Sequence, residues 1–322
     1  MAVLVFTENW DGKFKKYSFE LVSYASKIAE MLSTQTVAVS IGDVDDDALK
    51  QLSNYGADKI IAVNHDKLQY LDNQAYTSVL AQVAEKEDAN VLVIGHNNTG
   101  KAIAPRLSTR LKAGIGSDVK EVPSKLDPFT VNKKVFSGKA FADMVIKSER
   151  KILTIAQNSF DLIENAKDAS IESFEPEISN DLIKTEVKEV EKHRDQLILT
   201  DAEIVVSAGR GMKAPENWEP VEELANVLGG ATACSRPVSD EGWRPHEEHT
   251  GQTGKIIAPN LYFAIGISGA IQHIAGVSGS KCIVAINNDK DAPVFEVADY
   301  GIVGDAFEVL PKLIDAFEEH KS

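Results

Sequence analysis

Short apolar segments alternate with amphipathic segments along the first hundred residues of the chain. Apolar runs at residues 3–6, 37–41, 60–63 and 91–94 are separated by stretches at 19–32, 48–55 and 75–86 whose apolar residues recur at helical spacing. Short, continuous apolar runs between amphipathic helices are typical of parallel strands buried on both faces. The pattern predicts a doubly wound, mainly parallel sheet covered by helices on both faces.

The helical period disappears between residues 119 and 160. This stretch is interrupted by Pro123, Pro128 and Gly138 and ends in the strand-like run 151–156. Strand-like segments broken by proline and glycine favour a hairpin, so we expect an antiparallel edge on the first sheet.

A change of composition follows at residues 161–195. Asp, Glu, Lys and Ser dominate there, although Ile183, Val187 and Val190 could form a short strand. Few large apolar residues and many charges are typical of a connection between domains. We therefore predict a first domain at residues 1–190.

The alternating pattern then restarts and continues to the end of the chain. Strands are predicted at residues 203–207, 231–234, 261–265, 282–286 and 300–303, with helices at 221–228 and 306–317. The predicted fold class is therefore α/β, with two doubly wound, mainly parallel domains. The first resembles nucleotide-binding domains and has an antiparallel edge; the second, at residues 196–322, is of the Rossmann or flavodoxin type.

Polar or glycine-rich loops follow the strands of this second domain. The carboxyl ends of parallel strands gather at one edge of a sheet, so these loops should lie together. Backbone N–H groups where a strand turns into a helix suit a pyrophosphate. The set predicts a pocket for a dinucleotide: Gly209-Arg210-Gly211, Ser235-Arg236-Pro237, Thr250 to Gly254, Ser268-Gly269 followed by His273, Asn287 to Asp289, and Asp305.

Several of these residues have structural alternatives. His273 could be a core histidine, and Asp305 could simply be the residue that caps the last helix. Trp218, Trp243 and Tyr262 are expected to be core residues or partner contacts. His246 and His249 are three residues apart, but metal binding there is the less favoured interpretation.

A second polar loop runs from Gly95 to Lys101 in the first domain. Its glycine and lysine spacing is that of a phosphate-binding loop, but Ala102 stands where a metal-binding Ser or Thr is required. This loop leaves open an alternative function as a nucleotide hydrolase or transferase.

Composition restricts the choice of partners. The chain of 322 residues has a net charge of -15 and a pI near 5.0, which disfavours nucleic acids and anionic membranes. Cys234 and Cys282 are the two cysteines and do not have metal-site spacing. The N-terminus has no signal-peptide pattern, and no apolar run approaches the roughly 20 residues that span a bilayer. We expect a cytoplasmic protein without membrane insertion.

The ordered motifs of residues 196–318 closely resemble the alpha subunit of electron transfer flavoproteins. The similar segments are Gly-Arg-Gly, Ser-Arg-Pro, Gly-Gln-Thr-Gly-Lys, Gly-Ile-Ser-Gly-Ala-Ile-Gln-His, Ala-Ile-Asn and Ala-Asp-Tyr-Gly-Ile-Val. The resemblance implies a heterodimer with a beta subunit, one FAD held mainly by this chain, AMP in the beta subunit, and partner contacts through the N-terminal domain.

An electron carrier, not a self-sufficient enzyme, is the implied function. It would take electrons from flavin dehydrogenases, such as the acyl-CoA dehydrogenases of fatty acid β-oxidation, and pass them to a membrane quinone oxidoreductase. A guanidinium, imidazolium or amide donor near N1 and C2=O of a flavin stabilises the negative charge that reduction places there.

The resemblance also assigns site residues. Arg236 would lie against the isoalloxazine ring, Ser268 near the phosphates and His273 near the pyrimidine edge; the Thr253 hydroxyl could reach N5. Departures from the family are Thr250, where a valine is usual, and the segment from Arg244 to His249. The full cofactor-binding set is Arg210, Ser235, Arg236, Thr250, Gly251, Gln252, Thr253, Ser268, Gly269, Ala270, Ile271, Gln272, His273, Asn287, Asp305 and Ala306.

Overall fold

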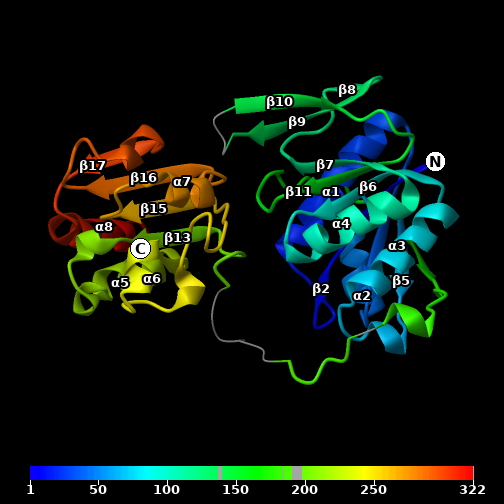
Figure 1. Ribbon diagram of the computed structural model, residues 1–322, viewed down its shortest axis with the longest axis horizontal. Helices are drawn as coiled ribbons and strands as arrows, with labels where there is room; N and C mark the ends of the chain where they lie inside the picture. The colour runs from blue at the N-terminus through cyan, green and yellow to red at the C-terminus, as the bar shows by residue number, and fades with distance from the viewer. Residues whose placement is uncertain (137–139, 184, 191–197, 322) are drawn as a thin grey trace. The chain divides into compact units, whose positions relative to one another are not determined.

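A computed structural model of the chain describes residues 1–136, 140–183, 185–190 and 198–321. The chain divides into two compact units, Met1–Glu191 and Lys192–Ser322 (Figure 1). Each unit has its own sheet and its own buried core, and each is described by itself.

The N-terminal unit is built on a ten-stranded sheet. Its path is β10-β9-β7-β11-β6-β1-β4-β5-β12, with β8 paired to β9. All neighbours from β7 to β12 are parallel, whereas β8, β9 and β10 pair antiparallel, which confirms the predicted antiparallel edge. The strands are β1 (Ala2–Phe6), β4 (Gln35–Ile41), β5 (Lys59–Val63), β6 (Ala89–Gly95), β7 (Gly114–Val119), β8 (Lys125–Leu126), β9 (Phe129–Val135), β10 (Ala140–Val145), β11 (Lys151–Ile155) and β12 (Ser170–Ser173); β2 (Asn9–Trp10) and β3 (Lys13–Phe14) form a separate hairpin.

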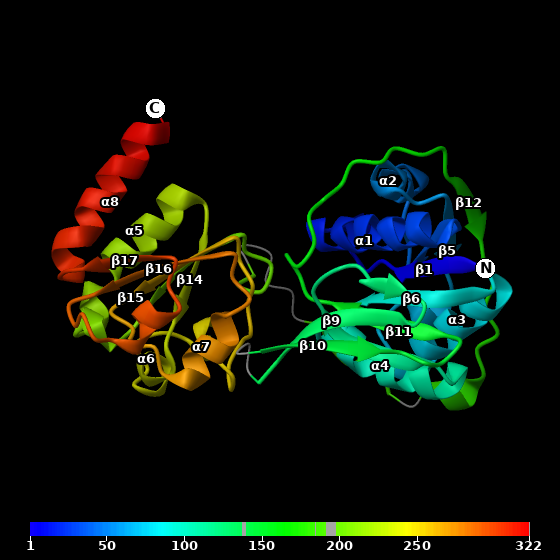
Figure 2. The same ribbon diagram turned by 90° about the horizontal axis from the view of Figure 1, so that it is seen from above.

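Helices cover both faces of this sheet, as Figure 2 shows. The helices are α1 (Lys16–Leu32) and α2 (Asp46–Gln51) on one face, and α3 (Asn73–Lys86) and α4 (Asn98–Leu111) on the other. In β1, Leu4 and Phe6 pack into the core of α3 and α4, while Val3 and Val5 pack into the core of α1. Both faces of β1 are buried, which is why its sequence is continuously apolar.

The predicted strand around Ile183, Val187 and Val190 is wrong. Ile183 packs against the core without joining a strand, Val187 and Val190 are exposed, and residues 185–190 have no regular structure; residue 184 lies outside the described residues. The edge strand is β12 instead, which pairs parallel with β5. Salt bridges from Glu172 in β12 to Lys59 and Lys86 hold this short polar strand in place.

The C-terminal unit is built on a five-stranded parallel sheet in the order β14-β13-β15-β16-β17. Helices α5 (Glu219–Leu228) and α8 (Ala306–Lys321) cover one face, and α7 (Ile271–Val277) covers part of the other. The strands are β13 (Ile204–Ala208), β14 (Ala231–Cys234), β15 (Leu261–Ile265), β16 (Cys282–Asn287) and β17 (Tyr300–Val303), and a short helix, α6 (Arg236–Asp240), follows β14.

The two units together confirm the predicted α/β, doubly wound fold class. In the C-terminal sheet the chain passes from β13 outward to β14 and then returns to β15 on the other side of β13. Ligands of such sheets bind at this switch point, outside the carboxyl ends of the strands. The candidate site must therefore be sought where β13 and β15 end.

Candidate functional site

The loops that leave β13 and β15 are hydrogen-bonded to each other. The backbone N–H of Gly209 donates to Ile265 O at 2.9 Å, and that of Gly211 donates to Gly266 O at 3.0 Å. A further bond of 2.8 Å, from Gly266 N–H to Ile286 O, attaches the loop after β15 to β16. These contacts fix the backbone on both sides of the switch point.

A run of free donors follows β15. Among the described residues, no protein group accepts a hydrogen bond from the backbone N–H groups of residues 268–272, whereas His273 and Ile274 both donate to Ala270 O. Gly269 has φ 89°, and a Cβ there would lie 2.3 Å from the backbone N of Val294, so only glycine fits. Consecutive free N–H groups at the start of a helix form a site for an anion such as a phosphate.

The predicted flavin loop, residues 250–254, packs directly on α7. Gln252 N–H donates to Gln272 O at 2.7 Å, and a Cβ on Gly276 would lie 2.4 Å from Gly251 Cα. The side chains of Gln252 and Thr253 are exposed. The loop backbone is therefore held by the helix, and two polar side chains stay available to a ligand.

Thr250 stands where the resemblance leads us to expect a valine, and the difference is confined to a buried side chain. Its side chain is buried, and its hydroxyl donates to Cys234 O at 3.3 Å. Its backbone N–H donates to the same oxygen at 3.0 Å. Any contact of Thr250 with a ligand would therefore involve the backbone.

Two buried histidines border this loop. His249 and His273 are 3% and 7% exposed, and Nδ1 of each has no hydrogen-bond partner among the described residues. Burial lowers the pKa of His273 to about 4, against a smaller opposing effect of the Thr250 backbone, and burial also lowers the pKa of His249. The His273 ring is therefore neutral at pH 7. A buried polar nitrogen without a partner is costly, and a bound ligand is one way to satisfy it.

Sequence reasoning missed a third member of this group. The Tyr262 hydroxyl lies 2.8 Å from His273 Nε2, and Tyr262 is fully buried. It is a core residue as expected, yet its polar end contacts a predicted site residue. The alternation of side chains along β15 could have indicated this contact, because Tyr262 and Ala264 lie on the face of the sheet that α7 covers.

The two predicted arginines lie on the surface with weak partners. Arg210 Nη1 is 3.7 Å from Glu241 Oε1, and Arg236 Nε is 3.3 Å from Asp240 Oδ2, with about two thirds of each arginine side chain exposed. Exposed pairs of this kind contribute little, so both guanidinium groups can turn toward an anionic ligand. Ser235 is buried and immediately precedes α6.

Asn287 and Asp305 already perform structural tasks. Asn287 Nδ2 donates to Ile267 O at 3.0 Å, which attaches β16 to the loop after β15. Asp305 Oδ1 accepts the N–H of Phe307 at 3.0 Å and so caps α8, in agreement with the structural alternative given above; Ala306 is buried in the first turn. Each keeps polar atoms at the same sheet edge.

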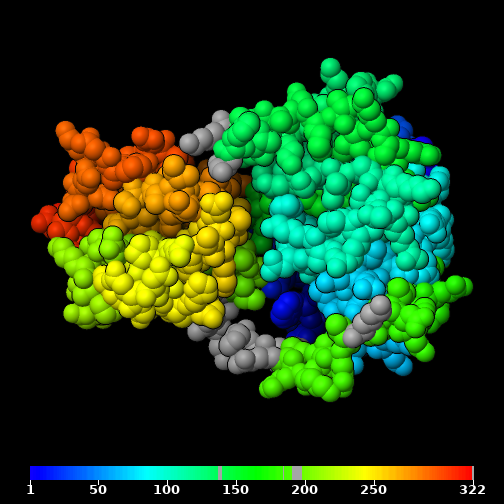
Figure 3. Space-filling model, viewed as in Figure 1, coloured from blue at the N-terminus to red at the C-terminus, as the bar shows by residue number. Residues whose placement is uncertain are grey.

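The unusual segment before the flavin loop is fixed by Arg244. Its guanidinium donates to both carboxylate oxygens of Glu248, at 2.7 and 2.8 Å, and to Glu222 of α5 at 2.6 Å, while it lies over the Trp218 ring. The stretch around residues 236–256, yellow in Figure 3, forms a continuous part of this unit's surface. Arg244 anchors that stretch to the helix layer.

The loop from Gly95 to Lys101 is held by hydrogen bonds within the N-terminal unit. Asn97 caps α4 by accepting the N–H of Gly100 at 2.9 Å, and the N–H of His96 is taken up by the Tyr17 hydroxyl and Ile155 O. Gly100 is required because a Cβ would lie 1.7 Å from Gly95 O. Its glycine spacing thus reflects helix packing, and the N–H groups of His96 and Gly100 are already bonded within the protein.

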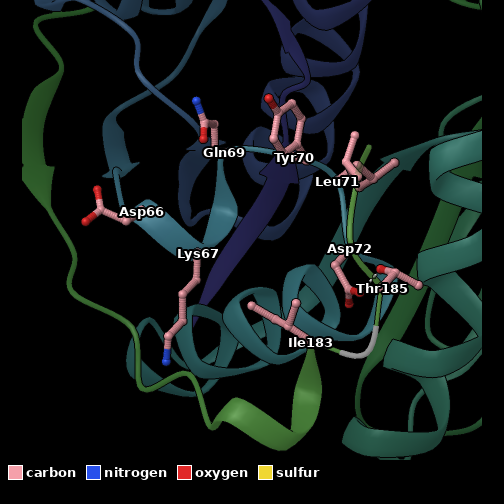
Figure 4. A pocket seen from close by; sticks show the side chains of 9 residues that line it. Asp66, Lys67, Gln69, Tyr70, Leu71, Asp72, Ile183 and Thr185 are labelled. Atoms are coloured by element: carbon pink, nitrogen blue, oxygen red, sulfur yellow. Dashed lines mark hydrogen bonds between the residues drawn. The ribbon is translucent and has the colours of Figure 1, made fainter. Parts of the chain in front are cut away.

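A shallow hollow in the N-terminal unit is also too small for a nucleotide. It lies between the segment 66–72 and the side chains of Ile183, Thr185 and Val187, and a 3.0 Å hydrogen bond joins Thr185 to Asp72 (Figure 4). Its volume of about 90 Å³ is well below the roughly 300 Å³ of the smallest usual ligand sites. Within the described residues, no three His, Cys, Asp or Glu side chains are grouped as metal ligands.

Fold and site together are those of a doubly wound α/β protein with a candidate nucleotide site at the switch point of a parallel sheet. Residues 3–179 match the electron transfer flavoprotein domain, and residues 198–278 match the electron transfer flavoprotein FAD-binding domain. The chain belongs to the electron transfer flavoprotein family, as a subunit of the alpha type.

Full-length relatives agree with this assignment. The electron transfer flavoprotein subunit alpha of Bacillus subtilis is 37% identical over 320 residues, covering 98% of this chain and 97% of that protein. The mitochondrial subunit alpha of Dictyostelium discoideum is 35% identical, covering 99% and 92%. The acryloyl-CoA reductase electron transfer subunit beta of Anaerotignum propionicum is 32% identical, covering 99% and 96%. No helix among the described residues is long and apolar enough to cross a membrane.

Proposed function

We propose that this chain binds one FAD along the carboxyl edge of its C-terminal sheet and carries electrons as the alpha half of a heterodimer with a beta subunit. The observation that supports this most directly is the run of free N–H groups at residues 268–272, beside two buried histidines with unbonded Nδ1 atoms. An anionic pyrophosphate and a flat polar ring are the ligands that would satisfy both features.

Each predicted residue has a place in this proposal. The backbone of residues 268–272 would hold the pyrophosphate, Arg210 and Ser235 would contact the cofactor beside it, and Arg236, with residues 250–253, would border the isoalloxazine ring. Asn287, Asp305 and Ala306 would lie toward the ribose and adenine. FAD supplies the redox chemistry when bound, and the protein supplies position and electrostatic bias.

That bias would come from two kinds of donor. Arg236 carries a permanent positive charge, which favours negative charge on a nearby flavin by about 1–4 kcal/mol at an effective dielectric between those of water and protein. His273 is neutral at pH 7, because its pKa is about 4, so it would act as a hydrogen-bond donor and not as an imidazolium. Arg236 would therefore supply most of the positive charge beside the flavin, and His273 would help to orient the flavin ring through a hydrogen bond.

The redox partners follow from the family. We propose flavin dehydrogenases, such as acyl-CoA dehydrogenases, as electron donors, a membrane quinone oxidoreductase as acceptor, and AMP as a ligand of the beta subunit. The name of the relative from Anaerotignum propionicum, which joins an electron transfer subunit to acryloyl-CoA reductase, supports acyl-CoA chemistry in the partner enzyme.

Co-expression with a beta subunit tests the cofactor. We expect a yellow heterodimer that releases FAD on denaturation, with a ratio of one FAD to each pair. Gly269→Ala should abolish the colour, because its Cβ collides with Val294. Gly42→Ala is the control, since Gly42 also has positive φ, of 123°, but belongs to the N-terminal unit. A folded, colourless wild-type heterodimer would contradict the proposal.

A further inference from the structure

Lys213 joins two of the predicted cofactor loops, although it belongs to none of the predicted motifs. It lies in the loop after β13, and its Nζ is 3.8 Å from Asp305 Oδ2 at the start of α8. The same ammonium group lies 4.7 Å from the centroid of the Phe307 ring. The strands that precede these loops, β13 and β17, are not neighbours in the sheet. Lys213 is therefore a side-chain bridge between separate parts of the carboxyl edge.

The backbone at Lys213 has a conformation that few residues adopt. Its φ is 70° and its ψ is -37°, and the N–H of Ala214 donates to Met212 O at 2.8 Å, which is close to the rare, strained form of the γ-turn. The Asn217 side chain donates to the same oxygen at 2.9 Å and so holds the turn. Glycine would adopt this conformation with less strain. Strain of this kind is concentrated at functional sites, which indicates that the lysine side chain has a task there.

The carboxylate of Asp305 is divided between two partners. Oδ1 accepts the N–H of Phe307 and caps α8, whereas Oδ2 faces Lys213. A carboxylate at the edge that is proposed to hold a pyrophosphate repels this anion unless a cation lies beside it. Lys213 supplies that cation.

The ion pair itself contributes little to folding. The Lys213 side chain is 65% exposed and that of Asp305 is 44% exposed. Exposed pairs at this separation have small effects on the free energy of unfolding. The effect of Lys213 should therefore be seen in the binding of an anionic ligand.

We propose that Lys213 is a positioning residue of the cofactor site. It holds and neutralises Asp305, so that this carboxylate can accept hydrogen bonds from the hydroxyl groups of a dinucleotide without repelling the pyrophosphate. This inference rests on the proposed FAD function. It assigns Lys213 a role through Asp305, without any contact of its own with the phosphates.

Fluorescence titrations with FAD, on the heterodimer after removal of its cofactor, test this role. In Lys213→Gln the dissociation constant for FAD should rise roughly fivefold relative to wild type at about 20 mM salt, and less than about twofold at about 1 M salt, where charges are screened over about 3 Å. Lys213→Arg keeps the positive charge and should bind FAD within about twofold of wild type.

Asp305→Asn separates neutralisation of the carboxylate from a direct contact of Lys213 with the phosphates. Asparagine keeps an oxygen that can cap α8 but carries no charge. In the Asp305→Asn background, Lys213→Gln should change the dissociation constant by less than about twofold, because no carboxylate is left to neutralise. An equal loss of affinity in both backgrounds would overturn the proposal, since Lys213 would then act on the phosphates directly.

Lys312→Gln provides the matched control. Lys312 is an exposed lysine of α8, the helix that Asp305 caps, and its loss changes the net charge by the same amount. The control should bind FAD as wild type does. An equal loss of affinity in the control, or unchanged affinity in Lys213→Gln at low salt, would refute the role of Lys213 and leave the FAD function intact. A wild-type heterodimer that binds no FAD would refute the FAD function, and the role of Lys213 with it.

Discussion

Gly276 in α7 offers a sharp test of how the flavin loop is positioned. A Cβ at residue 276 would lie 2.4 Å from Gly251 Cα and 2.6 Å from its backbone N and C atoms. Carbon atoms in contact prefer about 3.5–4.0 Å, so in Gly276→Ala the loop must move by about 1 Å or more. The atoms on both sides are backbone and cannot rotate away.

The stability cost of this change should be small. Overpacking costs about 1–3 kcal/mol, while alanine in a helix interior regains about 1 kcal/mol relative to glycine. The net loss in the free energy of unfolding is therefore about 0–2 kcal/mol. Binding should suffer more, because a displacement of about 1 Å in a positioned site costs up to roughly a hundredfold.

Two measurements on the purified protein separate these effects. Urea unfolding gives the stability, and a fluorescence titration with FAD gives the affinity. Gly279→Ala is the control, because its Cβ would lie no closer than 3.0 Å to any atom, Ala258 Cβ, and would meet the backbone atoms Ile257 O and Ala258 Cα at the ordinary contact distances of 3.5 and 3.7 Å. If Gly276→Ala is folded and binds FAD as tightly as wild type, the loop is not positioned by this contact and the reasoning is refuted.

Three further predictions concern the charges and histidines. Arg244→Leu should lower the free energy of unfolding of the C-terminal unit by about 1–3 kcal/mol in urea titrations, because Glu248 and Glu222 lose their shared partner, and Arg244→Lys should restore only part of it. The pKa of His273 is lowered from 6.5 to about 4 in the folded protein, so as the pH falls this histidine takes up its proton first in the unfolded chain. The free energy of unfolding, measured by urea titration, should therefore drop by up to about 3 kcal/mol between pH 6.5 and 4, and by less in His273→Gln. Hydrogen bonds from Lys59 and Lys86 lower the pKa of Glu172 to about 2. The stabilisation from this carboxylate is therefore fully present above the unfolded pKa of 4.5 and is lost as the pH falls toward 2. Because 40% of the Glu172 side chain is exposed, Glu172→Gln should lower the free energy of unfolding by no more than about 1 kcal/mol at pH 7, as measured by urea unfolding.

Elements with a strong apolar signal could be predicted from the sequence. Strands such as β1 and β6 are buried on both faces, so every residue in them is under the same constraint and the run is continuous. β12 could not be found in this way. Its sequence, Ser-Ile-Glu-Ser, contains one apolar residue, and its place depends on Lys59 and Lys86, which are distant in the sequence.

Within the site, loop positions were predictable and side-chain tasks were not. Strand exits are local features, so the motifs at Gly209, Ser235, Ser268 and Asn287 could be placed at one sheet edge. The bond between Tyr262 and His273 depends on the packing of a strand face against a helix, and the glycine spacing at Gly95 and Gly100 is shared by phosphate loops and by a tight strand-to-helix turn. Spacing alone cannot separate these two causes.

The arrangement of contacts separates the scaffold of the site from its electrostatic tuning. The loops at the switch point are held by backbone bonds and by glycine contacts, as between Gly211 and Gly266 or Gly251 and Gly276. The polar side chains that face outward from these loops, among them Arg236, Gln252 and Thr253, take little part in that scaffold, since they are exposed. Substitutions of these side chains should therefore alter cofactor affinity and reduction potential with little change in stability, whereas substitutions of the glycines should disturb the geometry on which any tuning depends.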